Sequence, residues 1–187
     1  MHFNGIGTEE DIEEAMRCFE RAGENKHKKS LEYLAKMYKE GIGVRANKEK
    51  AIKYFEKIAE NIEKEKGEAY FNIALIFSEN FLNSPNDFKS AIEFYEKSAL
   101  FGNKDALFNA GLLYYQQKDI PNAILFFKKS AFESNNADAY FNLAVIFKDH
   151  PKKSLFLLKK AAQLGNIEAQ QILVTKSFQF DENTPKN

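Results

Sequence analysis

The sequence predicts an all-α fold, a solenoid of stacked antiparallel helix pairs. Two sets of similar segments alternate along the chain, and each set recurs at intervals of about 31 to 40 residues. The first set comprises SLEYLAKMY from Ser30, AYFNIALIF from Ala69, ALFNAGLLY from Ala106 and AYFNLAVIF from Ala139. The second set comprises AMRCFERAG from Ala15, AIKYFEKIA from Ala51, AIEFYEKSA from Ala91, AILFFKKSA from Ala123 and SLFLLKKAA from Ser154. Self-similarity at such a period is typical of a repeat array.

Both sets have the apolar spacing of amphipathic helices. Tyr70, Ile73, Ala74 and Phe77 fall at i, i+3, i+4 and i+7, which places them on one stripe of a helix. The segments run for about 12 residues or more without two-residue alternation, so length favours helix over strand. We call the first set helix A and the second helix B. A small residue recurs in one column of helix A, where it lets two helices pack closely; its members are Ala35, Ala74, Gly111 and Ala144.

The repeats divide the chain into segments of similar length. We expect one repeat array over residues 1–177, followed by a disordered tail at residues 178–187. The array consists of a partial repeat at 1–25, repeats at about 26–66, 67–103, 104–136 and 137–166, and a capping helix at 167–177. The first repeat lacks nearly all of its helix A, so we expect the natural protein to continue N-terminally. Each helix B is followed by glycine or asparagine, in AGEN, FGNK, ESNNA and LGNI, as expected of left-handed helix ends.

The stretch GIGVRA has one spelling of the dinucleotide-binding fingerprint, G-x-G-x-x-A. That fingerprint must follow a strand and open a helix, whereas GIGVRA lies between a helix A ending near Glu40 and a helix B beginning near Asn47. A copy, GIGT, stands at the same distance before Ala15. We therefore interpret both as structural loops, in which the glycines take positive φ angles and Ile or Val enters the core.

Composition narrows the class of function. Lys plus Arg equals Asp plus Glu at 27 each, which argues against nucleic acid or an anionic membrane as the main partner. No apolar run approaches the ~18 residues of a membrane span. The single cysteine, Cys18, excludes an internal disulfide, and its place among apolar residues predicts a core position. We expect a cytoplasmic protein.

The residues that usually carry catalysis or bind metals form no recognisable pattern. His2, His27 and His150 lack metal-ligand spacing, and the phosphate-binding and zinc-protease motifs are absent. The sequence therefore predicts no catalytic residue, no metal and no cofactor.

The run LEYLAKMYKEGIGVRANKEKAIKYFEKIA resembles a repeat of the Sel-one-like (SLR) family, a relative of the tetratricopeptide repeats. The resemblance covers the chain from Asn4 to about Leu173. The loop SENFLNSPNDFKS lacks the glycines of the family, and the loops QQKDIPN and KDHPKK are shortened toward the tetratricopeptide length. The resemblance implies a right-handed superhelix whose A helices line a concave groove, where asparagines hold the backbone of an extended peptide.

Asparagine recurs in one column of helix A, at Asn72, Asn109 and Asn142. Because asparagine has only a modest helix propensity, three aligned copies call for a reason. An amide both donates and accepts hydrogen bonds and thus matches the backbone of any peptide. In the alternative interpretation, each asparagine bonds a loop or a neighbouring helix and fixes the register of the stack.

Apolar residues accompany these asparagines, whereas the repeat at 26–66 carries charges in the same columns, including Glu32 and Lys36. We therefore expect a groove that is charged at its N-terminal end and apolar at its C-terminal end, although packing between repeats would also explain the phenylalanines. The complete predicted peptide-binding set is Asn72, Asn109, Asn142, Phe71, Phe108, Phe141, Leu75, Leu112, Lys36 and Tyr115.

These observations favour a non-catalytic scaffold or adaptor that binds a protein or peptide segment in the concave groove. The main alternative is a regulatory or substrate-docking module of a longer protein, such as an enzyme. A catalytic domain beside the array in the full-length gene would favour this alternative. A third class, a binder of small molecules or cell-wall ligands, would show thermal stabilisation by such ligands and not by peptides. The sequence does not imply a homo-oligomer.

Overall fold

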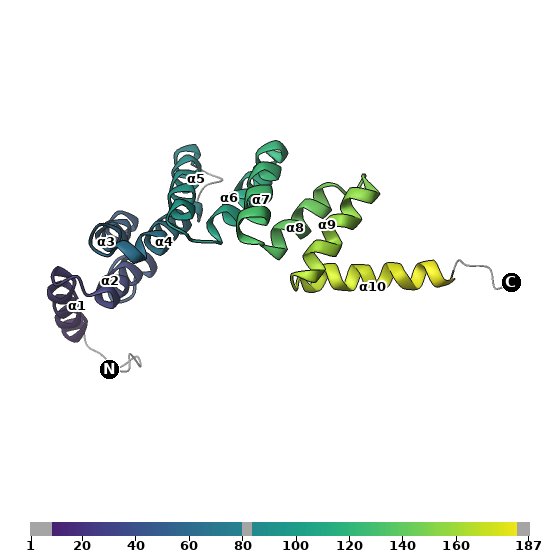
Figure 1. The fold of residues 1–187 in the computed structure, drawn as a ribbon. Helices are drawn as coiled ribbons and strands as arrows, with labels where there is room; N and C mark the ends of the chain where they lie inside the picture. Colours follow the sequence, from purple (N-terminus) through teal and green to yellow (C-terminus); the bar gives the residue numbers. More distant parts are fainter. Residues whose placement is uncertain (1–8, 80–83, 183–187) are drawn as a thin grey trace. The chain divides into compact units, whose positions relative to one another are not determined.

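The computed structural model describes residues 9–79 and 84–182, and the regular structure within these ranges is entirely helical (Figure 1). This confirms the predicted all-α fold. The chain forms two compact units, an N-terminal unit of residues 1–103 and a C-terminal unit of residues 104–187. The division falls where the sequence analysis places a boundary between two repeats.

The N-terminal unit contains five α-helices and one short 3-10 helix in its described part. They are α1 (Glu9–Glu24), α2 (Lys28–Glu40), α3 (Lys48–Asn61), η1 (Glu63–Glu65), α4 (Lys66–Ser78) and α5 (Pro85–Leu100). Each α-helix packs against the next one along the chain. Helices α2 and α4 are A helices, and α1, α3 and α5 are B helices.

The C-terminal unit repeats this arrangement, again with each helix packed against the next. Its helices are α6 (Ala106–Gln116), α7 (Ile120–Ser134), α8 (Ala137–Ile146), α9 (Pro151–Gln163) and α10 (Ile167–Glu182). Helix α10 runs five residues past the predicted end of the capping helix at residue 177. The physical reason is that TKSFQFDE contains neither glycine nor proline, so nothing in the sequence stops the helix before Pro185. Of the predicted tail, residues 183–187 lie outside the described part.

Each unit has its own apolar core, and the column of small residues lies inside it. Ala35 and Ala74 are fully buried in the N-terminal unit, and Gly111 and Ala144 are buried in the C-terminal unit. The prediction that this column marks a helix contact is confirmed. At Gly111 the contact is so close that an added Cβ would lie 2.7 Å from Cδ1 of Phe127.

The GIGVRA loop joins two helices, as predicted. Gly41 ends α2 at φ 72°, Gly43 follows at φ 69°, and Asn47 caps α3 by accepting a hydrogen bond from the Lys50 amide at 2.8 Å. Of the two apolar residues, Val44 packs against the core while Ile42 is exposed. The GIGT copy lies outside the described residues.

The turns after the B helices confirm three of the four predicted left-handed positions. Gly102, Asn135 and Gly165 have positive φ angles, but in the first turn Lys26 takes this conformation instead of Gly23. Gly23 lies within α1, where an added Cβ would be only 2.6 Å from Cδ2 of Leu31. Gly23 therefore allows the close packing of α1 on α2 and does not form the turn.

The predicted core position of Cys18 is wrong, because its side chain is exposed on α1. Met16 is buried and Phe19 is partly buried, whereas Cys18 lies outside the stripe that these two residues share and points toward solvent. In the next three repeats the aligned residues, Tyr54, Phe94 and Phe126, stack on an aromatic ring of the preceding A helix. No such helix precedes α1 in the described part of the chain.

Candidate functional site

The three aligned asparagines adopt the same arrangement on α4, α6 and α8. Each is half-buried and donates a hydrogen bond from Nδ2 to the backbone carbonyl four residues earlier. These distances are 2.9 Å for Asn72, 2.9 Å for Asn109 and 2.8 Å for Asn142. No described residue donates a hydrogen bond to Oδ1 of any of the three. Each asparagine thus keeps a carbonyl acceptor available on the surface of its A helix.

The bond to the carbonyl is not specific to this column. Asn25 and Asn61, near the ends of two B helices, bond the carbonyls of Arg21 and Lys57 in the same way, at 3.0 and 2.7 Å. The intrahelical bond is therefore a property of asparagine on these helices. What distinguishes the A-helix column is its recurrence at one position of three repeats.

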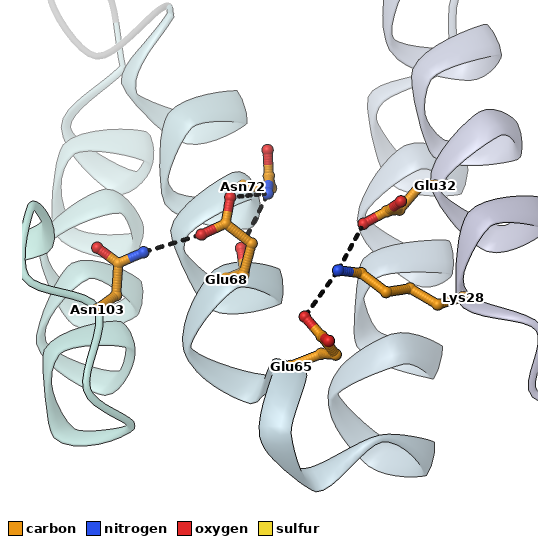
Figure 2. A network of polar contacts seen from close by, with 6 residues as sticks. All are labelled: Lys28, Glu32, Glu65, Glu68, Asn72 and Asn103. Atoms are coloured by element: carbon orange, nitrogen blue, oxygen red, sulfur yellow. Dashed lines mark hydrogen bonds and ion pairs between the residues drawn. The ribbon is translucent and has the colours of Figure 1, made fainter.

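A polar network runs beside this column in the N-terminal unit, and Figure 2 shows its contacts. The Nδ2 atom of Asn103 donates to Oε2 of Glu68 at 3.1 Å, while Asn72 reaches Oε1 of the same carboxylate at 3.4 Å. In the C-terminal unit, Asn166 donates to Oδ1 of Asp138 at 2.7 Å. An asparagine after one helix B therefore binds the acidic residue at the start of the preceding helix A.

The sequence analysis missed this link, although its signal was present. Asparagine follows the glycine in both FGNK and LGNI, and an acidic residue stands four positions before Asn72 and Asn142. These contacts link the end of helix B to the start of helix A within one repeat. They give that structural role mainly to the residues after helix B, and only Asn72 of the aligned column joins the network by its side chain.

The phenylalanine column packs mainly within its own repeats. The ring centroids of Phe71 and Tyr95, which is on α5, lie 5.7 Å apart. Those of Phe108 and Phe127, which is on α7, lie 5.8 Å apart. Phe141 packs against the C-terminal core. All three are half-buried, as are Leu75 and Leu112, so the column leaves a partial apolar surface beside the asparagines.

Helix α2 presents a different surface. The Lys28 ammonium bridges Glu32 at 3.3 Å and Glu65 at 2.7 Å (Figure 2), and the hydrogen bond with Glu65 raises the pKa of Lys28. Tyr33, in the asparagine column, is exposed and stacks on Phe19. Lys36 is also exposed, so this face of α2 is polar. Tyr115, the last predicted site residue, is exposed near the end of α6.

Other kinds of site find no support in the described residues. They contain no group of three or more His, Cys, Asp or Glu side chains arranged to hold a metal ion. None of their helices is long and apolar enough to cross a membrane.

Family models match the chain along most of its length. The Sel1 repeat model matches residues 1–27, 29–61, 67–103 and 137–166, more than half of the chain. The chain belongs to the Sel1 repeat family. A tetratricopeptide repeat model matches residues 105–130, in one of the two repeats whose loops are shortened.

Solved structures show the same fold. A Sel1 repeat protein from Oxalobacter formigenes is 24% identical over 83% of this chain and 66% of its own, with a TM-score of 0.57. The protective antigen c5321 of uropathogenic Escherichia coli, which has an SLR fold, is 27% identical over 83% of this chain and 34% of its own, with a TM-score of 0.58. MamA is 17% identical over 89% of this chain and 99% of its own, with a TM-score of 0.56.

This chain therefore spans about two thirds of the first of these proteins and about one third of the second. Among curated proteins, none matches the chain. Sel1 and tetratricopeptide repeats generally serve as non-catalytic scaffolds for protein–protein interaction, and this role is typical of the family to which the chain belongs.

Proposed function

We propose that this Sel1 repeat chain is a non-catalytic scaffold that binds an extended segment of a partner protein on the exposed faces of its A helices. The observation that carries the proposal is the repeated conformation of Asn72, Asn109 and Asn142. In each, no described residue donates a hydrogen bond to Oδ1, and an intrahelical hydrogen bond from Nδ2 holds the side chain in place.

The intrahelical bond prepares each asparagine for binding. It restricts the side-chain rotamer before a ligand arrives, so less conformational entropy is lost on association. The carbonyl oxygen then accepts from a peptide N–H, and on Asn109 and Asn142 the second Nδ2 hydrogen can donate to a peptide C=O, whereas on Asn72 it faces the Glu68 carboxylate. Because these contacts involve only the backbone, they hold an extended segment without reading its sequence.

Selectivity then comes from the neighbouring columns. Phe71 and Leu75 on α4, and Phe108 and Leu112 on α6, are half-buried and offer partial apolar surfaces to a ligand side chain. On α2, by contrast, the residue aligned with Leu75 is Lys36, which is exposed. On the N-terminal unit, a partner segment with apolar side chains and a negatively charged group fits the surfaces of α4 and α2.

A random library of displayed peptides provides the test. Binders selected on the parent chain are measured by fluorescence anisotropy against the triple variant Asn72→Ala, Asn109→Ala, Asn142→Ala. A double variant Asn25→Ala, Asn61→Ala is the matched control, because it loses the same intrahelical bonds away from the A-helix faces. Circular dichroism and urea unfolding establish that all variants are folded.

We expect the triple variant to lose affinity by roughly tenfold or more, because each lost hydrogen bond contributes about 0.5–1.5 kcal/mol. The control should bind as the parent does. Equal binding of selected peptides to parent and triple variant would refute the role of the asparagines.

A further inference from the structure

Helix α9 carries a strongly unbalanced charge. Its sequence, PKKSLFLLKKAAQ, contains four lysines and no carboxylate. All four lysines are exposed, and none forms an ion pair with a carboxylate of the described residues. The overall balance of 27 basic and 27 acidic residues therefore hides a local basic surface.

The B helices of the N-terminal unit do not share this property. Helix α3 also has four lysines, but three glutamates accompany them. On α5, Lys97 pairs with Glu93 at 2.8 Å. The basic surface of α9 is therefore not a general consequence of the repeat.

An exposed aromatic side chain stands at the middle of the basic surface. Phe156 is 59% exposed, although burial of a phenylalanine is favourable by about 1.5–3 kcal/mol. Lys152 and Lys153 lie one helical turn before it, and Lys159 and Lys160 lie one turn after it. Because an α-helix rises about 1.5 Å per residue, the stretch from Lys152 to Lys160 is about 12 Å long. We call these five residues the α9 stripe.

A pocket adjoins the N-terminal end of the stripe. It has a volume of about 440 Å³ and is lined by Phe147, His150, Pro151, Lys152 and Lys153. The Lys153 ammonium lies 3.3 Å from the centroid of the Phe147 ring, and the His150 ring lies 6.3 Å from that ring. The pocket thus combines an aromatic ring with two lysines and a histidine.

We propose that the α9 stripe and this pocket form a second docking surface, for an acidic amphipathic segment of a partner protein. The segment carries an apolar side chain that covers Phe156, with carboxylates one helical turn to either side. One of these carboxylates, on a long side chain, enters the pocket beside Lys152 and Lys153. The occupant follows from charge complementarity, because four lysines without acidic partners surround one exposed aromatic ring.

An anionic membrane would also attract lysines and an exposed phenylalanine. The depression is shallow, but with the two lysine pairs it favours a protein segment, because these groups match single side chains at helical spacing whereas a lipid surface presents a broad layer of headgroups. The membrane is therefore an outcome that the test must be able to reveal.

The probe is a fluorescein-labelled helical peptide that has a central tryptophan and two glutamates one turn to either side. Its counterpart with glutamines in place of the glutamates tests the charge requirement. Binding to the full chain is measured by fluorescence anisotropy at low and high salt. In parallel, sedimentation with phosphatidylcholine vesicles, with and without phosphatidylserine, tests the membrane.

Two charge variants are compared. Lys152→Gln, Lys159→Gln removes two positive charges from the stripe, and Lys53→Gln, Lys57→Gln removes two from α3, whose glutamates remain. We expect the first variant to bind the acidic peptide roughly 2- to 30-fold more weakly and the second to bind as the parent does. Phe156→Ala should weaken binding by about tenfold, and high salt should weaken binding to the parent.

Equal loss of binding in both charge variants would overturn the proposal, because the attraction would then be non-specific. Equal binding of the glutamine peptide, or absence of measurable binding to the parent, would also overturn it. Sedimentation of the chain with phosphatidylserine vesicles, without binding of the peptide, would assign the stripe to a membrane instead. The triple asparagine variant should retain full affinity for the acidic peptide, which separates this surface from the A-helix faces.

Discussion

Replacing Gly111 with alanine tests how closely the A and B helices of one repeat pack. An alanine Cβ at this position would lie 2.7 Å from Cδ1 and 2.8 Å from Cε1 of Phe127. The Phe127 ring is fully buried and lies 5.8 Å from the ring of Phe108, so it has little room to withdraw. The substitution therefore forces a movement of the ring or of the helices.

Two effects of opposite sign decide the magnitude. Alanine is favoured over glycine in a helix interior by about 1 kcal/mol. Overpacking of a well-packed core costs about 1–3 kcal/mol. We therefore expect Gly111→Ala to lower the free energy of unfolding by about 1 kcal/mol, within a range from about zero to about 2 kcal/mol.

Urea unfolding of the full chain, followed by circular dichroism, measures the change. The midpoint should fall while the dependence on urea stays the same, because the surface exposed on unfolding does not change. In a Phe127→Leu background the steric conflict is relieved, so Gly111→Ala should become stabilising there. A stabilisation of about 1 kcal/mol in the parent background would refute the reasoning, since helix propensity alone would then account for the result.

Five further outcomes can be measured on single variants or on the parent. Ser98→Ala removes a hydroxyl that donates to the Gly67 carbonyl of α4 at 2.7 Å and should cost about 1 kcal/mol. Ser130→Ala removes a buried hydroxyl that has no hydrogen-bond partner among the described residues, so it should leave the urea midpoint unchanged or raise it. Ala74→Leu should cost about 1–3 kcal/mol, and an unchanged midpoint would show that this column does not lie at a helix contact. Cys18 should react with a maleimide in the folded protein nearly as fast as in urea; strong protection would contradict its exposure. Lys28→Gln should cost less than about 1 kcal/mol at neutral pH. The pKa of Lys28 is raised above its ordinary 10.5, so the stabilisation by its charge is complete below that pH and is lost as the pH rises through the pKa of the folded state. If the parent and Lys28→Gln still differed in free energy of unfolding by the same amount at higher pH, the ion pair would be contradicted.

The helices of the repeat were predictable because their ends carry local signals. Gly41 supplies the left-handed residue that ends α2, and Asn47 supplies the side-chain oxygen that caps α3. Neither requires knowledge of the rest of the fold. The column of small residues was predictable for a related reason, because its recurrence at the repeat period identifies a shared packing position.

The errors concern residues whose environment depends on a neighbouring helix. Gly23 has the position of a helix-ending glycine, but Leu31 of the next helix packs against it, and only the tertiary contact reveals this use. Cys18 aligns with residues that gain partial burial from the preceding A helix, and α1 has none in the described part of the chain. Local periodicity gives the direction of a side chain but not what lies opposite it.

The candidate site was predictable in the same partial way. Alignment of the repeats placed Asn72, Asn109 and Asn142 on corresponding faces, and the structure adds their common conformation. The contact from Asn103 to Glu68 was not predicted, because it depends on how the end of helix B lies against the start of helix A, which the pattern of either helix alone does not contain.

Comparison of aligned positions suggests where this repeat protein obtains specificity. Inward-facing columns recur with little change, because each must fill the same space between two helices. One outward-facing position of helix B reads Lys53, Glu93, Leu125 and Phe156 in successive repeats. Packing does not restrict this position, so its chemistry can change without cost to the fold. The binding properties of the array can therefore differ from repeat to repeat on the B-helix surface, while the recurring asparagines keep the exposed faces of α4, α6 and α8 alike. For this reason the two proposed surfaces can be tested, and can fail, independently.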